Sequence, residues 1–406
     1  MQPSPAFIGR QPVLNRNQQI IGYQLLFRPV ATGSMPAADD EPANGAHVLV
    51  NTLSNMDAAA LIGNKFAFIK VGQGLLVSEF LELLHPRRVI LELCPSLPAS
   101  AEMRRRVVHL RQHGFGLALD DYQPGGEQDS FLPAINYVKL NLARLGQERL
   151  EKTAATLRQH PVILIAEQVE SHDDFRWCRS IGIDGFQGHY FTRAETLNNR
   201  SIHPQLANII NLLNMLRGNA DLDEIELGFR QDVAMSYKLF HYINSAGFAL
   251  VNEVASFRQA VTLLGYQKLY RWLTLLLVTA SEEVGAPSAL LKTAVTRGRF
   301  MELLTRNIGH GHESDNGFIV GMFSLIHVLL EMPLESALDN LLLPEIARHA
   351  LLEQSGWLGQ LLQLVIACED PALRDVQVLA EALGLSAQTL NSAHVAALGW
   401  VEELRI

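Results

Sequence analysis

Charged and amide side chains follow a series of short apolar segments in the first half of the chain. Five such segments succeed one another, and they carry Glu92, Asp120 with Asp121, Lys139 with Asn141, Glu167 with Glu170, and Gln187. Carboxylates that converge repel one another unless a divalent cation or a cationic ligand lies between them. A single aspartate at a strand end is more simply a helix cap, but five such segments in a row favour a site.

The spacing of these segments indicates how the side chains would be brought together. From "FAFIKV" onward the apolar segments recur about every 20–27 residues, which is typical of successive β-α units. "AFIGRQPVL" and "IIGYQLLF" are expected to pair as an antiparallel hairpin across the polar turn "NRNQQ". Eight strands in about 190 residues predict an α/β fold, a (β/α)8 TIM-like barrel with one antiparallel strand. In such a barrel, chemistry lies at the carboxyl ends of the strands.

The second half of the chain has a different pattern. From about Leu206 onward, apolar residues are spaced at three and four, as in amphipathic helices. We therefore expect a barrel domain over residues 1–200 and an all-α domain over residues 201–406. The segment at 31–46, rich in Ala, Pro, Gly and Asp, is predicted to be a loop.

Composition narrows the class of protein. The chain has 406 residues, of which 48% are hydrophobic and 18% charged, and this balance predicts globular domains with sizeable cores. A net charge of −9 gives no sign of a nucleic-acid partner, and the basic run "MRRRVVHLRQH" is interpreted as the solvated face of a helix. No signal-peptide pattern and no apolar run long enough for membrane insertion is found, so a cytoplasmic location is expected.

Several motifs of the first half resemble the EAL domain, a bacterial barrel that hydrolyses cyclic di-GMP. "GYQLLFR" stands at the position of the signature motif, and the other matching stretches are "LELCPS", "ALDDYQPGG", "YVKLN", "IAEQVES" and "GFQGHYF". The second half resembles the HDOD domain, a helical relative of HD-type phosphohydrolases that lacks their metal-binding pair. "RQDVAMSYKLFHYINSAGFALVNEV" and the stretch after it carry that resemblance. The tandem is similar to the EAL-HDOD proteins of bacterial signalling.

The resemblance implies a two-metal site with magnesium or manganese, in which carboxylate and amide oxygens hold both ions. It assigns metal positions to Glu92, Asp120 and Asp121, the lysine beside the attacking water to Lys139, and supporting positions to Glu167 and Gln187. Arg28 corresponds to the arginine that contacts phosphate, so Arg28, Glu167 and Gln187 are the expected nucleotide-binding residues.

Departures from the family pattern argue against catalysis. Gln24 replaces the signature glutamate, Lys70 stands where the family has a metal-binding asparagine, Pro95 replaces a glutamate, and Asn141 replaces an aspartate. An ammonium about 4 Å from a divalent cation would repel it by roughly 8 kcal/mol at a dielectric constant of about 20. Lys70 is instead expected to form ion pairs with the surplus carboxylates. On this interpretation the catalytic and metal residues are vestigial and no cofactor is expected.

Three hypotheses remain open at this point. The first is a non-hydrolytic signalling protein that acts through contacts with an unidentified protein partner, with self-association as a homodimer a further option. The second is a cyclic di-GMP receptor that binds the nucleotide without hydrolysis. The third is an active cyclic di-GMP phosphodiesterase with an altered metal site.

Two histidine-containing stretches outside these motifs have simpler interpretations. In "SHDD", Ser171 is expected to cap a helix, so the His-Asp pair behind it is not a phosphohydrolase site. In "GHGHE", His310, His312 and Glu313 are expected to lie in a solvent-exposed loop, because no third histidine stands at ligand spacing.

Overall fold

A computed structural model describes residues 6–29, 62–78, 81, 84–192, 202–230, 232–243, 254, 256–283, 286–369 and 376–404. The predicted loop at 31–46 and the predicted domain boundary at 200 lie outside these residues. The chain groups by its internal contacts into two compact units. One contains the barrel, and the other consists of Ala194–Ala286 and Leu290–Gln363.

The barrel opens with an antiparallel hairpin, as the sequence predicts. Strand β1 (Ala6–Asn15) pairs with β2 (Ile20–Pro29), and the tight turn between them leaves no room for a crossover helix. The end of β1 also pairs with the last strand, through Leu14 and Phe186, and this contact closes the barrel.

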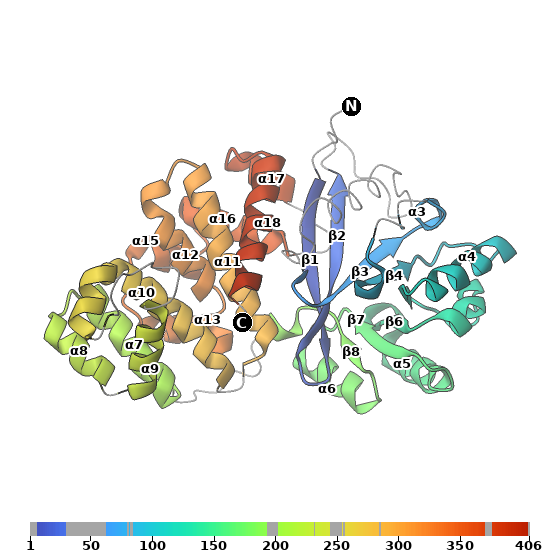
Figure 1. Ribbon diagram of the computed structural model, residues 1–406, viewed down its shortest axis with the longest axis horizontal. Coiled ribbons are helices and arrows are strands. Elements are labelled where there is room, and N and C mark those ends of the chain that lie inside the picture. The colour runs from blue at the N-terminus through green and yellow to red at the C-terminus, as the bar shows by residue number, and fades with distance from the viewer. Residues whose placement is uncertain are drawn as a thin grey trace. The chain divides into compact units, whose positions relative to one another are not determined.

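The remaining strands are parallel and follow one another around the barrel in sequence order, so the predicted fold class is confirmed (Figure 1). They are β3 (Phe66–Val71), β4 (Val89–Leu93), β5 (Gly116–Leu119), β6 (Tyr137–Asn141), β7 (Ile163–Glu167) and β8 (Gly185–Phe186). The described helices of this part are α3 (Gln73–Leu76), α4 (Ala101–Gln112), α5 (Leu142–Leu157) and α6 (His172–Ser180), with short 3-10 turns η2 (Pro86–Arg88), η3 (Glu127–Ala134) and η4 (Tyr190–Thr192).

An apolar layer fills the barrel interior. It consists of Val13, Phe68, Ile90, Ala118 and Ile165, one residue from each of five strands, and all of them are almost fully buried. Side chains alternate between the two faces of a strand, so the residue two positions further along each strand also points inward. The apolar layer therefore fixes which side chains of each strand meet at the next level of the barrel.

The second unit is helical, as the 3,4 spacing of its apolar residues predicts. Its elements are α7 (Pro204–Arg217), α8 (Leu222–Arg230), α9 (Val233–Ile243), α10 (Phe257–Glu283), α11 (Ser288–Asn307), η6 (Gly311–Glu313), α12 (Ser314–Phe323), α13 (Ile326–Leu329), α14 (Leu334–Asp339), α15 (Glu345–Leu352) and most of α16 (Gly356–Ala367). Helix α10 is interrupted at Gly265, where a φ of 73° is readily adopted only by glycine.

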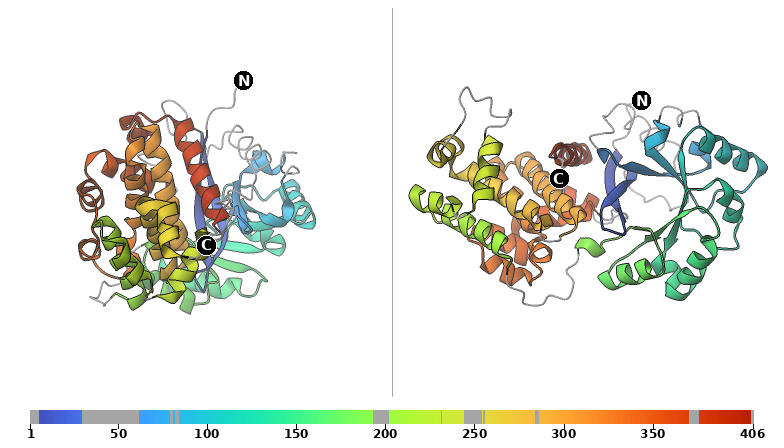
Figure 2. Two further views of the ribbon diagram at one scale, coloured as in Figure 1. Left: turned by 60° about the vertical axis from the view of Figure 1, so that its left-hand side comes forward. Right: turned by 60° about the horizontal axis from the view of Figure 1, so that its bottom comes forward.

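The C-terminal helices group with the barrel. Residues Leu364–Ile406 form part of the barrel unit, and they include α17 (Val376–Ala382) and α18 (Ala387–Glu403). Helix α18, drawn in red, contacts strand β1 and lies beside the blue hairpin in Figure 2. Among the described residues, no helix combines the length and the apolar character needed to cross a membrane.

Candidate functional site

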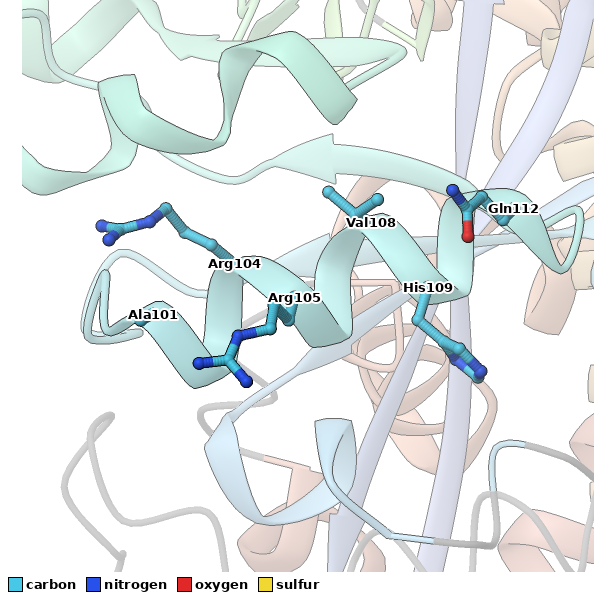
Figure 3. A pocket seen from close by; sticks show the side chains of 6 residues that line it. All are labelled: Ala101, Arg104, Arg105, Val108, His109 and Gln112. Carbon is cyan, nitrogen blue, oxygen red and sulfur yellow. The ribbon is translucent and has the colours of Figure 1, made fainter.

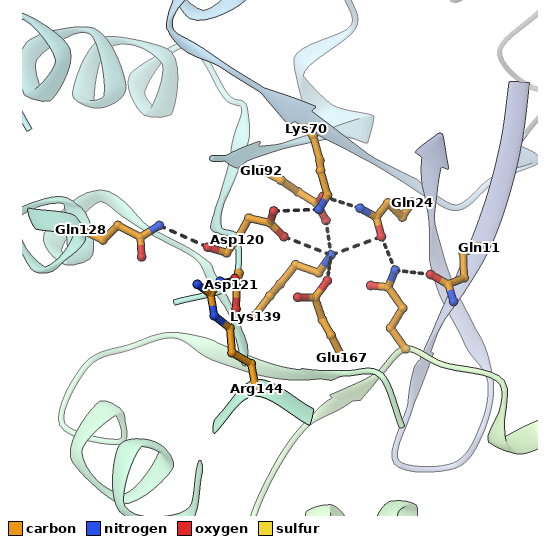
Figure 4. Close-up of polar contacts among 11 residues, drawn as sticks. Gln11, Gln24, Lys70, Glu92, Asp120, Asp121, Gln128, Lys139, Arg144 and Glu167 are labelled. Carbon is orange, nitrogen blue, oxygen red and sulfur yellow. Dashed lines mark hydrogen bonds and ion pairs between the residues drawn. The ribbon is translucent and has the colours of Figure 1, made fainter. Parts of the chain in front are cut away.

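A layer of polar side chains follows the apolar layer toward the carboxyl ends of the parallel strands. Figure 4 shows the polar contacts among these side chains. For β3, β4, β5 and β7 the polar residue stands two positions after a member of the apolar layer, and on the antiparallel β1 it stands two positions before one. On β6, Lys139 stands two positions after Tyr137, which packs against the apolar layer. We call this set the polar layer, and its members are Gln11, Gln24, Lys70, Glu92, Asp120, Lys139, Glu167 and Gln187.

Lys139 lies at the centre of the polar layer and is fully buried. Its Nζ atom is 2.7 Å from Glu92 Oε1, 2.7 Å from Glu167 Oε1 and 3.8 Å from Asp120 Oδ1. Burial alone would lower the pKa of Lys139, but the surrounding carboxylates raise it above its ordinary value. Lys139 is therefore a buried cation that several anions compensate.

Lys70 is the second cation of the layer. Its Nζ lies 2.8 Å from Asp120 Oδ2, which is the kind of ion pair expected from the sequence. The Lys70 side chain is 46% exposed whereas that of Asp120 is 5% exposed, so the lysine reaches the carboxylate from the solvent side. Burial works to lower the pKa of Lys70, and the charges of Asp120 and Glu92 outweigh it and raise the pKa.

Glu92 is the most enclosed carboxylate of the layer, with no exposed surface. Its Oε2 accepts a hydrogen bond of 3.0 Å from Gln24 Nε2, while its other oxygen faces Lys139. Burial raises the pKa of Glu92 to about 7, Asp120 adds to the rise, and Lys139 opposes it. Gln24, which replaces a glutamate of the family pattern, thus acts here as a hydrogen-bond donor to a carboxylate.

Three glutamines form the side of the layer next to the hairpin. Gln187 Nε2 donates to Gln11 Oε1 at 2.7 Å and also to Gln24 Oε1. Gln187 Oε1 is buried and has no hydrogen-bond partner among the described residues. Gln11 was not among the predicted site residues. The only signal for it was its place opposite Gln24, which becomes visible once the register of the hairpin is known.

Other predicted site residues lie outside the polar layer. Asp121, at a positive φ of 44°, turns away and forms an ion pair with Arg144. Asn141 caps α5, its side chain accepting a hydrogen bond from the backbone N–H of Arg144 at 3.0 Å. Pro95 is exposed. Arg28 lies in β2, and its side chain is outside the described residues.

The two histidine-containing stretches, "SHDD" and "GHGHE", lie outside the polar layer. Ser171 caps α6 in a reciprocal capping box with Asp174, as predicted. His312 is exposed, as expected, whereas the ring of His310 stacks on Trp357 with ring centroids 4.2 Å apart. Within the part of the chain that is described, no group of three His, Cys, Asp or Glu side chains is arranged to hold a metal ion.

The basic run predicted to be a solvated helix face forms α4. A shallow depression of about 420 Å³ lies along this helix, lined by Ala101, Arg104, Arg105, Val108, His109 and Gln112 (Figure 3). All of these residues are exposed, which confirms the prediction. None of them belongs to the polar layer.

Two family models match this chain in succession. The EAL domain model matches residues 70–194, and the HDOD domain model matches residues 202–343. The chain is an EAL-HDOD protein. The EAL match begins at Lys70 and therefore leaves out the hairpin with Gln11 and Gln24. Residues 344–406 of this EAL-HDOD protein lie beyond the HDOD match.

Two curated relatives are similar to this chain over most of its length and most of their own. The cyclic di-GMP phosphodiesterase CdgJ of Vibrio cholerae is 26% identical over 401 residues, which are 98% of this chain and 93% of CdgJ. YuxH of Bacillus subtilis, an uncharacterized protein, is 25% identical over 367 residues, which are 88% of this chain and 89% of YuxH.

Solved structures are similar to about half of this EAL-HDOD protein. An EAL domain protein from Listeria monocytogenes has 17% identity and a TM-score of 0.40, covering 47% of this chain and 88% of the other. Klebsiella pneumoniae BlrP1, in a manganese/cy-diGMP complex, has 21% identity and a TM-score of 0.38, covering 46% of this chain and 55% of the other.

Proposed function

We propose that this EAL-HDOD protein is a signalling protein whose barrel does not hydrolyse cyclic di-GMP and which acts through contacts with a protein partner. One observation carries the proposal. The ammonium of Lys70, which stands where the family has a metal-binding asparagine, pairs with Asp120, and that of Lys139 pairs with Glu92 and Glu167. A carboxylate engaged in this way must give up its partner before it can bind a metal ion.

Hydrolysis of a phosphodiester by two metal ions needs carboxylate oxygens that are free to bridge both ions. Here Glu92 and Glu167 each lie 2.7 Å from the Lys139 ammonium, and Asp120 lies 2.8 Å from that of Lys70. The remaining oxygen of Glu92 accepts a hydrogen bond from Gln24. This donor set does not fit a two-metal centre.

The charge balance supports the same proposal. Three carboxylates, Glu92, Asp120 and Glu167, face two ammonium groups, so the polar layer has a net charge of −1 when all three carboxylates are ionised. With the glutamate and asparagine of the family pattern in place of Gln24 and Lys70, the same layer would have a charge of −3. Two divalent ions carry a charge of +4, so the residues present compensate them poorly.

The name of the relative CdgJ makes hydrolysis the competing proposal. The deciding experiment is turnover of cyclic di-GMP by the full-length protein with magnesium or manganese. We expect no product above the level of the Asp120→Ala variant, which removes a central carboxylate. Turnover by the wild type that Asp120→Ala abolishes would overturn the proposal.

A nucleotide receptor is the second candidate, and one observation favours it. Gln187 Oε1 is buried without a hydrogen-bond partner among the described residues, so it is an acceptor that a bound base could satisfy. Calorimetry with cyclic di-GMP and no metal tests this candidate. Binding heat that is lost in Gln187→Leu would support a receptor. The absence of heat at high micromolar nucleotide would exclude the receptor and leave the protein-contact function as the remaining proposal.

A further inference from the structure

No helix between β1 and β2 is available to cover the outer face of the hairpin that begins the barrel. In a (β/α)8 barrel the helix that follows each strand packs on the outside of the sheet. Strand β1 is followed directly by β2, so no crossover helix is available to cover it. Another part of the chain must bury the outward side chains of β1, which include Arg10.

Helix α18 fills this place. It lies against β1, and residues 364–406 belong to the barrel unit by their contacts. Its buried residues Leu390, Ala393, Ala397 and Val401 are spaced by three and four positions, so they share one face of the helix. The face that α18 buries is therefore mainly apolar, with the buried His394 as a polar exception, and Glu402 follows directly after Val401.

A buried polar contact joins α18 to the hairpin. Arg10 Nη1 lies 3.0 Å from Glu402 Oε1, with the two side chains 6% and 11% exposed. Tyr23 Oη donates to the same Glu402 oxygen at 3.4 Å, and the Arg10 guanidinium lies 4.1 Å from the centroid of the Tyr23 ring. A buried ion pair of this kind leaves an uncompensated charge when one partner is removed.

The residues that Glu402 contacts are next to members of the polar layer. Arg10 precedes Gln11 and Tyr23 precedes Gln24, and alternation along each strand puts one of each pair outside and the other inside. Gln11 and Gln24 are partners in the register of the hairpin. A shift of either strand at its outer face therefore moves the amides that contact Glu92 and Gln187.

We propose that residues 376–404 are a regulatory segment of the barrel, which holds Gln11 and Gln24 in place through the contact of Glu402 with Arg10 and Tyr23. When the segment is docked, the hairpin is fixed and the polar layer is closed. When it is released, the hairpin loosens and the amides of the layer move. The helical unit is bounded in sequence by parts of the barrel unit, so the chain itself links that unit to the docking of α18. This proposal does not depend on whether the barrel hydrolyses a nucleotide.

Hydrogen exchange of the full-length protein tests the docking. The variant is Glu402→Gln, and the matched control is Glu403→Gln, which removes the neighbouring, exposed carboxylate of the same helix. We expect amide exchange in β1 and β2 to become at least about tenfold faster in Glu402→Gln and to change less than about twofold in Glu403→Gln. Unchanged exchange in the hairpin, or equal acceleration in every strand, would overturn the proposal.

A second measurement separates regulation from simple support of the fold. The ammonium of Lys139 contacts Gln24 at 3.5 Å, and its ¹⁵Nζ resonance in labelled protein reports on the polar layer. We expect this resonance to shift in Glu402→Gln and to stay unchanged in Glu403→Gln. Faster exchange in the hairpin with an unchanged Lys139 resonance would mean that α18 supports the fold without acting on the layer.

Discussion

Replacing Lys70 by asparagine restores the residue of the family pattern at the mouth of the barrel. The Lys70 ammonium lies 2.8 Å from Asp120 Oδ2. A divalent ion bound to that carboxylate at about 2.1 Å would lie about 4–5 Å from the ammonium. The substitution removes this repulsion and frees one carboxylate, so we expect Lys70→Asn to bind manganese more tightly than the wild type.

The exposure of Lys70 sets the size of the effect. At about 4 Å, a single charge and a divalent ion repel each other by roughly 8 kcal/mol at a dielectric constant of about 20, but by only about 2 kcal/mol in water. Because the Lys70 side chain is 46% exposed, the lower value applies. About 2 kcal/mol corresponds to a dissociation constant roughly 30-fold lower in Lys70→Asn.

Titration of free Mn²⁺ by electron paramagnetic resonance measures this constant directly. Lys70→Arg keeps the charge and should bind as weakly as the wild type. Lys152→Asn removes a lysine that is 74% exposed and pairs with Glu148, which is not a member of the polar layer, and should have no effect. If Lys70→Asn binds no better than Lys70→Arg, the charge of Lys70 is not what keeps metal out and our reasoning fails.

Three further predictions concern stability. Lys139→Met should lower the free energy of unfolding by about 3–5 kcal/mol, because it leaves buried carboxylates uncompensated. Lys70→Met should lower it by less than about 1 kcal/mol, because Lys70 is half exposed. Urea unfolding measures both changes, and the opposite ranking would contradict this prediction. Folding raises the pKa of Glu92 from 4.5 to about 7, so its stabilising contribution is complete below pH 4.5 and is lost as the pH rises through 7. The wild type should therefore lose stability relative to Glu92→Gln over that window, and parallel pH curves would refute it. Ser171→Ala removes a capping box and should cost about 1 kcal/mol in thermal unfolding, whereas an unchanged melting temperature would show that the cap contributes little.

Much of the barrel follows from the sequence because its signals are local. The apolar segments, their spacing and the turn after Asn15 predict the strand order and the one antiparallel strand. The convergence of Glu92, Asp120, Lys139 and Glu167 follows from the same argument, since the carboxyl ends of parallel strands meet at one end of a barrel. Their convergence could therefore be predicted without knowing any contact between distant parts of the chain.

The parts that the sequence did not predict depend on long-range contacts. Gln11 joins the polar layer only because β1 runs antiparallel and faces β2 in one register. The contact between Arg10 and Glu402 spans almost the whole chain, and no pattern in either segment announces the other. The sequence also did not predict the exposure of the Lys70 side chain, which lowers the expected repulsion between Lys70 and a divalent ion from about 8 to about 2 kcal/mol.

The two lysines of the polar layer differ in what their removal is expected to change, the stability of the fold or the binding of a metal ion. Lys139 is fully buried and contacts two carboxylates at 2.7 Å, so removing it leaves largely buried anions without a compensating charge. Lys70 reaches Asp120 from the solvent side, so water can replace it when it is removed. A barrel that lost Lys139 would lose stability, whereas one that lost Lys70 would keep its fold and gain an open carboxylate. Of the two lysines, Lys70 is therefore the one whose substitution is expected to affect metal binding more and the fold less.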